Sequence, residues 1–128
     1  MNVSRKSVEQ YLKDVRKAVA KGRYRIAMND NRRDNIRLFE DYVIDELMAK
    51  EILLSLRVRD FSNILMNEHQ GYEQEELYVF GKKVKLLERY GTSEKTVSLY
   101  IKINKLESGF VIVISFHEQN HPINYYFE

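Results

Sequence analysis

The sequence predicts an α+β fold in which N-terminal helices pack on a mainly antiparallel, twisted sheet. Between Val97 and Asn104 apolar and polar residues alternate, which is the period of a strand with one buried face. The segment from Phe110 to Phe116 is apolar at nearly every position, as expected for a central strand covered on both faces. Helical spacing dominates the first half of the chain instead. Helices followed by a meander of strands are typical of α+β layers.

The first helix is predicted to begin at Ser7, because Gln10 lies three residues later at the spacing of a capping box. Apolar residues then recur at helical spacing, and Gly22 ends the helix. These apolar residues are Val8, Tyr11, Leu12, Val15 and Val19. The opposite face carries Lys13, Arg16, Lys17 and Lys21. This basic face is either ordinary solvated surface or a contact for RNA or a protein partner.

Shorter elements are predicted next. Arg23 to Met28 is a candidate strand, and Arg32 to Tyr42 a candidate helix after a turn of Asn and Asp residues. The inward residues of that helix are expected to be Ile36, Phe39 and Val43.

Two further helix starts are predicted at aspartates. Asp45 is a candidate N-cap for a helix from Leu47 to Leu56, which contains good helix formers. Asp60 is expected to cap a last short helix that carries Phe61, Ile64 and Leu65.

The rest of the chain reads as a polar loop and then strands. Asn67 to Gln74 is the loop, and its His69 is interpreted as a solvated side chain. Strands are expected at Glu76–Phe80 and Val84–Tyr90 around a turn of Gly81, Lys82 and Lys83. Gly91 to Ser93 leads into the strand pair described above, and another strand pattern follows Pro122.

Length and composition favour one domain over residues 1–128. The chain is 44% apolar and 31% charged, and it has no cysteine, so disulfides and thiolate metal sites are excluded. No apolar run has the length of a membrane span, and the N-terminus lacks a signal-like stretch, so we expect a cytoplasmic protein.

Charge is distributed unevenly along the chain. Residues 1–38 hold eleven Lys and Arg against four Asp and Glu, whereas residues 39–76 hold three against ten. Residues 77–128 hold seven against five. A basic first third and a mildly basic sheet are consistent with a polyanionic partner, or with pairing to the acidic middle of the chain.

Several common catalytic motifs are absent from the sequence. There is no phosphate-binding glycine loop, no HExxH and no nucleophile elbow. The three histidines are scattered and no two have ligand spacing on one element, so we expect neither a metal site nor a cofactor.

The strongest candidate site lies on two consecutive strands. Tyr100 and Lys102 share the polar face of one strand, and Ser115 and His117 share a face of the next. A loop of two residues, or of four from Glu107 to Phe110, keeps polar residues opposite polar ones; the four-residue loop places Tyr100 opposite His117. A five-residue loop would set Lys102 against an isoleucine and is disfavoured.

A face with Tyr, Lys and His suits cleavage of RNA by its own 2′-hydroxyl group, without a metal. An imidazole such as that of His117 can transfer protons near neutral pH. The ammonium of Lys102 can stabilise charge on the phosphorane, and Tyr100 can hydrogen-bond a phosphate or stack on a base. The alternative is that His117 is an ordinary strand-end histidine and Lys102 an exposed strand lysine.

Ordered motifs from about residue 35 to 127 resemble the MqsR family, the toxins of bacterial toxin–antitoxin pairs. They are AKEILLSLRVRDF at 49–61, ELYVFGK at 76–82, SLYIKIN at 98–104 and VISFHEQNHPINYYF at 113–127. The resemblance implies a RelE-like fold and an endoribonuclease, an mRNA interferase that cuts single-stranded mRNA. It also implies a cognate antitoxin that binds and silences the toxin.

The resemblance also assigns residues. Tyr100 and Lys102 match the family's strand tyrosine and the lysine two residues on, and His117 falls where the founding member has a lysine. Asn63 and Glu75 stand where that member has a lysine and a glutamine, so the catalytic apparatus is either rearranged around His117 or weakened. Candidates for holding the RNA backbone are Lys82, Lys83, Lys85 and Arg89.

Two interpretations remain open from sequence. The first is an active RNase with His117, Lys102 and Tyr100 in its site. The second is a non-catalytic RNA- or protein-binding module, a degenerate toxin. Four N-terminal arginines are candidates for contact with either RNA or an acidic antitoxin: Arg23, Arg25, Arg32 and Arg33.

Overall fold

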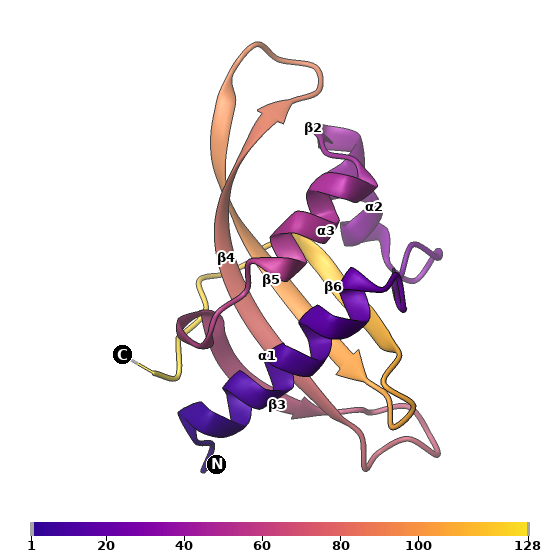
Figure 1. The fold of residues 1–128 in the computed structure, drawn as a ribbon. Coiled ribbons are helices and arrows are strands. Elements are labelled where there is room, and N and C mark those ends of the chain that lie inside the picture. The colour runs from indigo at the N-terminus through magenta and orange to yellow at the C-terminus, as the bar shows by residue number, and fades with distance from the viewer. Residues whose placement is uncertain (1, 128) are drawn as a thin grey trace.

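The computed structural model describes residues 2–127 and combines three α-helices with a six-stranded, strongly curled sheet (Figure 1). α1 and α3 cross one face of the sheet, while α2 packs against β6. The helices are α1 (Arg5–Ala20), α2 (Arg33–Asp41) and α3 (Glu46–Leu54), followed by the single 3₁₀ turn η1 (Val58–Asp60). The predicted α+β class, with N-terminal helices on a mainly antiparallel twisted sheet, is confirmed.

The sheet has the order β1-β6-β5-β4-β2, and β3 also pairs with β4. Its strands are β1 (Tyr24–Ile26), β2 (Tyr42–Val43), β3 (Phe61–Met66), β4 (Glu76–Glu88), β5 (Glu94–Lys105) and β6 (Val111–Glu118). β1 runs parallel to β6, and the other pairs are antiparallel. The long β4, β5 and β6 form its centre, and β2 and β3 share the outer edge of β4.

The first helix begins earlier than predicted. Ser4, and not Ser7, is the N-cap, because the Ser4 hydroxyl accepts a hydrogen bond from the backbone N–H of Ser7 at 3.0 Å. The predicted inward residues are all buried, with Ala18 added. Gly22 follows the helix at φ +73°, a conformation that glycine adopts without a steric penalty.

The helix at Asp45 is confirmed, since its carboxylate accepts from the backbone N–H of Met48 at 2.8 Å. The inward face predicted for α2 is wrong in part: Leu38 and Asn35 are the buried residues, whereas Val43 belongs to β2 and is 41% exposed. The predicted inward face is displaced by one residue along the helix, because a buried asparagine does not stand out in an apolar pattern.

The side chain of Asn35 bonds to the edge of β6 where a neighbouring strand would otherwise pair. Its amide nitrogen donates to the carbonyls of Ala27 at 2.8 Å and Ile114 at 3.0 Å, and its oxygen accepts from Phe116 N–H at 2.8 Å. β1 stops at Ile26, so two of these bonds satisfy backbone groups of β6 that would otherwise be buried without partners.

Three predicted elements are wrong. The short helix after Asp60 is the strand β3, and Asp60 instead accepts from Arg57 N–H at 2.9 Å within η1. The turn at Gly81–Lys83 does not form, because β4 runs unbroken from Glu76 to Glu88. The segment after Pro122 forms no strand among the described residues, although Tyr126 N–H donates to the Phe61 carbonyl at 3.0 Å.

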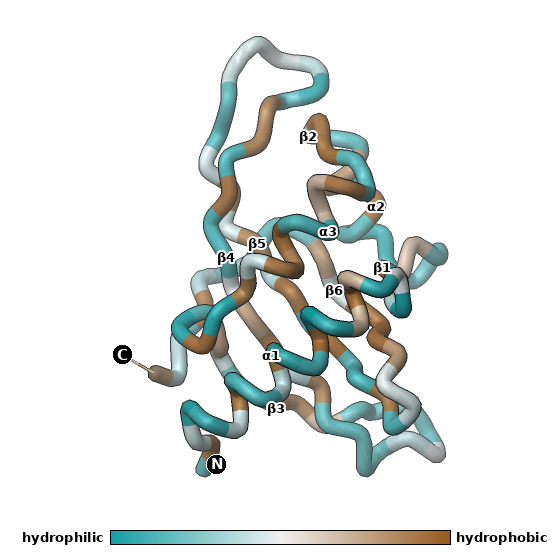
Figure 2. The backbone as a smooth tube through the Cα atoms, in the orientation of Figure 1, coloured by the Kyte–Doolittle hydropathy of each residue, from teal (hydrophilic) through white to brown (hydrophobic). Residues whose placement is uncertain are grey.

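The hydrophobic core lies between α1, α3 and one face of the sheet, where hydrophobic segments of the strands lie behind α1 (Figure 2). Fully buried side chains in this layer include Leu12, Leu53, Leu99, Ile101, Ile103 and Phe116. Each contributes about 1.5–3 kcal/mol by leaving water. We call the opposite sheet face, away from α1 and α3, the open face. No helix among residues 2–127 is both long and apolar enough to cross a membrane.

Candidate functional site

The pairing of β5 with β6 brings two predicted site residues together on the open face. Tyr100 lies directly opposite His117, and Lys102 lies opposite Ser115. The rings of Tyr100 and His117 are stacked, with centroids 5.3 Å apart and planes inclined by 17°. The predicted pairing is therefore confirmed.

The loop that produces this pairing differs from the prediction. Leu106 N–H donates to the Phe110 carbonyl at 2.9 Å, which closes a three-residue turn with Gly109 at φ +90°. A turn of that length alone would set Lys102 against Ile114. The strands instead shift by one residue between Lys102 and Ile103, so that Ile114 is the extra residue of a β-bulge. The bulge places polar side chains of β5 opposite polar side chains of β6, as the predicted two-residue and four-residue loops would have done.

His117 presents one ring nitrogen without a protein partner. Its Nδ1 lies 2.8 Å from the backbone carbonyl of Glu118, and a carbonyl can only accept, so this contact requires a hydrogen on Nδ1. In a neutral ring the lone pair is then on Nε2, which has no hydrogen-bond partner among residues 2–127. Nε2 is therefore the atom available to accept a proton.

Tyr100 is half-buried and keeps its phenolic hydrogen. Burial raises the pKa of its hydroxyl group above the ordinary value of 10.0. The hydroxyl group has no hydrogen-bond partner within the described part of the chain. It is thus a neutral donor beside the imidazole.

Lys102 is a half-buried cation that makes no direct ion pair within the described residues. Burial, and next the positive charge of Arg32, lower the pKa of its ammonium group, while Glu68 opposes the shift. The ammonium group has no hydrogen-bond or ion-pair partner within residues 2–127. Lys102 and Arg32 outnumber the one nearby carboxylate, Glu68, so the local positive charge is in excess and favours a bound anion.

Lys102 lines a pocket of about 460 Å³ on the open face. Arg32 and His69 are its other basic or titratable nitrogen groups, and Glu68 is its carboxylate. Apolar residues complete the walls, among them Leu65, Leu77 and Ile114. His69, interpreted from sequence as a solvated loop residue, is thus brought to the same pocket as Lys102. Sequence spacing does not reveal this, because Arg32, His69 and Lys102 come from separate elements.

His117 lines a different and smaller pocket, of about 240 Å³, against α2. Its charged neighbours there are Asp34, Arg37, Asp41 and Glu118. Arg37 was not singled out from the sequence, where nothing distinguishes it from other helix-surface arginines. The structure therefore joins Tyr100 to His117 but directs Lys102 toward the adjacent pocket.

The four predicted backbone-binding residues fall into two groups. Lys83 and Lys85 are exposed on the open face, opposite Ser98 and Thr96 of β5. Lys82 lies on the other face, where its Nζ is 3.2 Å from the Ser55 carbonyl and 3.4 Å from Asp60 Oδ2.

Arg89, like Lys82, makes hydrogen bonds within the protein. Its Nη2 donates to the carbonyls of Phe39 at 3.0 Å and Tyr42 at 3.1 Å, at the end of α2. The structure brings Lys83 and Lys85, and not Lys82, to the face that carries Tyr100.

Glu75 and Asn63 also have defined places. Glu75 Oε1 accepts from the amides of Asn67 at 2.9 Å and Asn104 at 3.0 Å, which ties the loop before β4 to β5. Asn63 lies on β3 opposite Val79, whose neighbour on β5 is Lys102. Glu75 is thus a structural acceptor, and Asn63 shares the open face with Lys102.

The C-terminal segment packs beside Tyr100. Gly81 pairs with Tyr100, and a Cβ atom at Gly81 would lie 2.6 Å from both Ile123 Cδ1 and the Tyr125 hydroxyl oxygen. This close approach, rather than a turn, explains the glycine after Phe80. Gln119, whose Nε2 donates to the Leu99 carbonyl at 3.0 Å, holds the start of the same segment against β5.

Among residues 2–127, no group of three or more histidine, aspartate or glutamate side chains is arranged to hold a metal ion. Comparisons with protein-family models, with curated proteins and with solved structures find no match to this chain.

Proposed function

We propose that this chain is a metal-independent endoribonuclease that cuts single-stranded RNA by attack of the 2′-hydroxyl group. The observation that carries the proposal is the stacked pair of Tyr100 and His117, with a free Nε2 and a free phenol. Lys102, a cation without a direct ion pair among residues 2–127, is the next residue of β5 on the same face. Base, neutral donor and cation are the groups that this reaction needs.

In the proposed reaction His117 Nε2 takes the proton of the 2′-hydroxyl group. The 2′-oxygen bonds to phosphorus, and the bond from phosphorus to the 5′-oxygen breaks. The departing 5′-oxygen receives a proton from the ammonium of Lys102, whose lowered pKa eases this transfer. The products are a 2′,3′-cyclic phosphate and a 5′-hydroxyl group. Tyr100 donates to a non-bridging oxygen, and Arg32 stabilises the added negative charge.

The resemblance to MqsR-family toxins extends the proposal. It adds a RelE-like fold, mRNA as the substrate in a bacterial cytoplasm and a cognate antitoxin as the protein partner. Lys83 and Lys85 are then placed to contact the RNA backbone on the open face. Lys82 and Arg89 remain predictions of the same role, although each also holds the fold.

Cleavage of RNA by purified protein in the presence of a chelator tests the function, with mapping of the new 5′ ends. His117→Ala should lower the rate by about 10²–10⁴-fold while leaving the fold intact. His121→Ala is the matched control, because His121 is exposed and lies outside the sheet, and it should cleave like the original chain. Substrates with 2′-deoxyribose at the cut should resist. Equal cleavage by the His117 and His121 variants would show that His117 does not belong to the catalytic site.

One observation favours a second candidate, an RNA-binding module without catalysis. Lys102 and His117 line separate pockets, so one ligand can occupy either without the other. RNA binding that depends on Lys102, with no cleavage by folded protein, would establish this alternative.

A further inference from the structure

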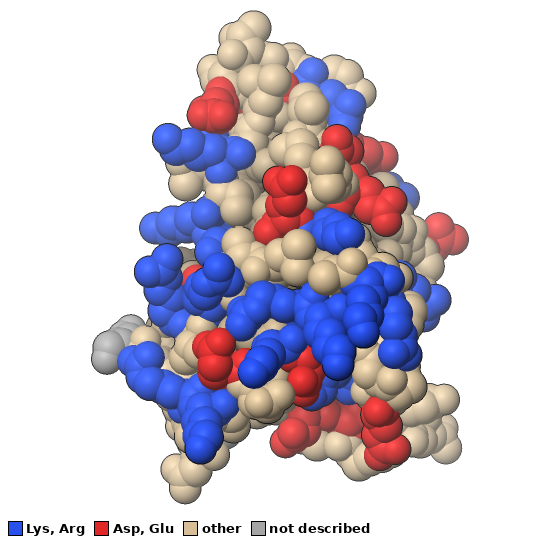
Figure 3. Space-filling view, viewed as in Figure 1, with Lys and Arg blue, Asp and Glu red and all other residues tan. Residues whose placement is uncertain are grey.

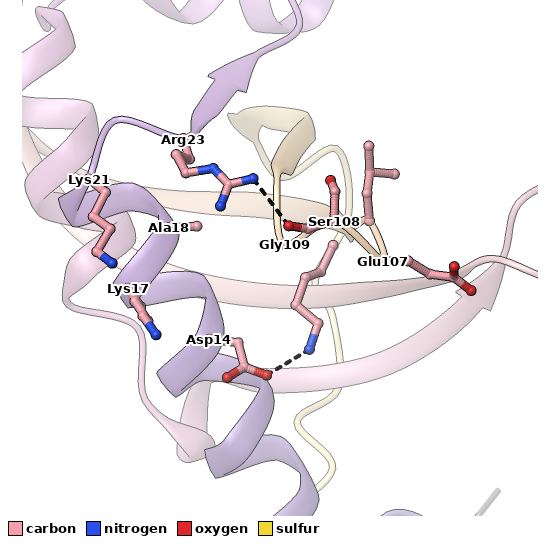
Figure 4. Close-up of a pocket in the computed structure, with 10 residues that line it drawn as sticks. Asp14, Lys17, Ala18, Lys21, Arg23, Glu107, Ser108 and Gly109 are labelled. Carbon is pink, nitrogen blue, oxygen red and sulfur yellow. Dashed lines mark hydrogen bonds and ion pairs between the residues drawn. The ribbon is translucent and has the colours of Figure 1, made fainter.

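A basic pocket lies outside the site described above, between α1 and the turn that joins β5 to β6 (Figure 4). Its volume is about 480 Å³, and its lining contains four cations against two carboxylates. The cations are Lys17, Lys21, Arg23 and Lys105. Lysine and arginine side chains also form a band over α1 on the helix-covered face (Figure 3).

The carboxylates do not neutralise this pocket. Asp14 Oδ2 is engaged by Lys105 Nζ at 2.8 Å, and this hydrogen bond is the main reason that the pKa of Asp14 is lowered. In Figure 4 the side chain of Glu107 extends away from Lys17, Lys21 and Arg23. The other three positive groups therefore share the pocket without a direct ion pair among residues 2–127, although Asp14 also lies within the field of Lys17.

Two of these cations are fully available. Lys17 and Lys21 are exposed, and neither has a hydrogen-bond or ion-pair partner within the described residues. Lys17 lies in the last turn of α1 and Lys21, four residues later, is its C-cap, a spacing at which like charges repel each other. Arg23 is oriented by one bond, from Nη2 to the Ser108 carbonyl at 3.1 Å, which leaves its other donors free. An anion bound here would relieve the repulsion.

The pocket is connected to the open face by arginines around β1, the edge strand. Arg25 of β1 pairs with Ile112 of β6 and is exposed on the open face, since its neighbours Tyr24 and Ile26 pack against the core. Beyond β1, Arg32 lines the pocket of Lys102. Positive side chains thus continue from Lys21 and Arg23, past Arg25, to the proposed active site.

The surface around this pocket suits a charged backbone better than a protein. No large hydrophobic residue is exposed between Asp14 and Ile26 or in the turn from Lys105 to Phe110, as far as residues 2–127 are concerned. Protein interfaces have an apolar or aromatic centre, which is lacking here. Phosphates need only cations and donors, and they bind through them regardless of sequence.

We propose that Lys17, Lys21 and Arg23 bind a backbone phosphate of the RNA strand whose scissile bond lies at Tyr100 and His117, and that the strand passes over Arg25 and Arg32 between the two places. This proposal rests on the proposed function for the position of the scissile bond. The binding of RNA to the pocket can be measured without cleavage.

The test is the affinity of the full chain for a 2′-O-methyl RNA of about 16 nucleotides, which cannot be cut, measured by fluorescence anisotropy over a salt series. Lys17→Ala combined with Lys21→Ala should weaken binding about ten-fold at low salt and reduce the slope of log affinity against log salt by about 0.7, for one lost phosphate contact. Lys6→Ala with Lys50→Ala is the matched control on α1 and α3, and it should change neither quantity.

Cleavage separates the two proposals. A substrate of about four nucleotides occupies the Tyr100–His117 site alone, so the pocket variant should cut it at the original rate while losing activity on long RNA. Unchanged binding and salt slope in the pocket variant would overturn the phosphate site and leave the endonuclease standing. RNA binding that depends on Lys17 and Lys21, without cleavage of any RNA, would support the phosphate site and overturn the endonuclease. Stronger binding of a poly-glutamate peptide than of RNA would overturn the site in favour of an acidic protein.

Discussion

Lys82 and Lys102 lie on adjacent strands of one sheet, yet their surroundings are opposite. On the helix-covered face the side chain of Lys82 is 20% exposed, and its Nζ contacts the Ser55 carbonyl and the Asp60 carboxylate. On the open face Lys102 is half-buried with no such partner and faces Arg32. Because burying a charge without a partner is costly, the first lysine stabilises the fold and the second is kept at an energetic cost.

The same contrast extends to the neighbours of each lysine. On the helix side the polar groups of Asn35 and Asp60 are bonded within the protein. On the open face the Tyr100 hydroxyl and His117 Nε2 have no partner among residues 2–127. Satisfied groups hold a structure, whereas convergent unsatisfied groups are free to bind a ligand.

Replacing Lys102 by Met should show the largest effect. Loss of the ammonium group that protonates the departing 5′-oxygen should lower RNA cleavage by about 10²–10³-fold, as for removal of a general acid. The free energy of unfolding should stay the same or rise, because an unpaired half-buried charge is removed. Single-turnover cleavage and urea unfolding measure the two quantities. Lys6→Met, at an exposed lysine of α1, is the control. A fall in stability of Lys102→Met as large as its fall in activity would contradict the contrast with Lys82.

Asn35→Ala should affect stability and not chemistry. It removes three hydrogen bonds and leaves Phe116 N–H buried without a partner, so the free energy of unfolding should fall by about 2–3 kcal/mol. Urea unfolding tests this, with the exposed Asn31→Ala as the control. A change below about 0.5 kcal/mol would show that β6 does not need this edge contact.

Lys82→Met should cost less, about 1–2 kcal/mol, since the Asp60 carboxylate keeps its bond from Arg57 N–H but loses its cation. A double-mutant cycle with Asp60→Asn isolates the pair. Cleavage per folded molecule should not change. If Lys82→Met instead lowers RNA affinity at unchanged stability, the lysine serves RNA and the contrast with Lys102 disappears.

The smallest effect concerns pH. The pKa of Lys102 is lowered in the folded chain, so the unfolded chain binds its proton more tightly. Stability should therefore gain from this group as pH rises from the lowered pKa to the ordinary value of 10.5. The stability advantage of Lys102→Met should shrink over that window.

Buried tyrosines act in the other direction over a neighbouring pH range. Tyr11 and Tyr78 have raised pKa values, so both proteins lose stability above about pH 10, where unfolded tyrosines ionise. The difference between the two unfolding curves isolates Lys102. A difference that stays constant with pH would show that Lys102 carries no perturbed charge in the folded chain.

Local sequence signals predicted α1, α3 and β5 well because their information lies within a few residues. Asp45 caps a helix through an N–H three residues away, and alternation along β5 needs no partner strand to be recognised. Phe61 to Met66 was wrongly predicted as a helix, since Phe61, Ile64 and Leu65 fit a helical face as well as a short strand. Hydrogen bonding to β4 stabilises this segment as a strand.

The candidate site was predictable only as two polar strand faces. Polar alternation pointed to Tyr100 opposite His117, and the structure bears out that pairing through an unpredicted bulge at Ile114. Local patterns could not predict that Lys102 shares a pocket with Arg32 and His69, since these residues come from separate elements that only the fold brings together.

By itself the sequence determined the α+β class, the cap at Asp45 and the buried stripes of α1 and β5, because periodicity and capping act over one or two turns. The tertiary structure alone decided that Lys82 faces away from Tyr100 and that Gly81 leaves room for the C-terminal segment. It also decided that Lys17 and Lys21, at the end of α1, share a pocket with Arg23. Strand register sets these contacts, and a shift of one residue turns every side chain to the other face.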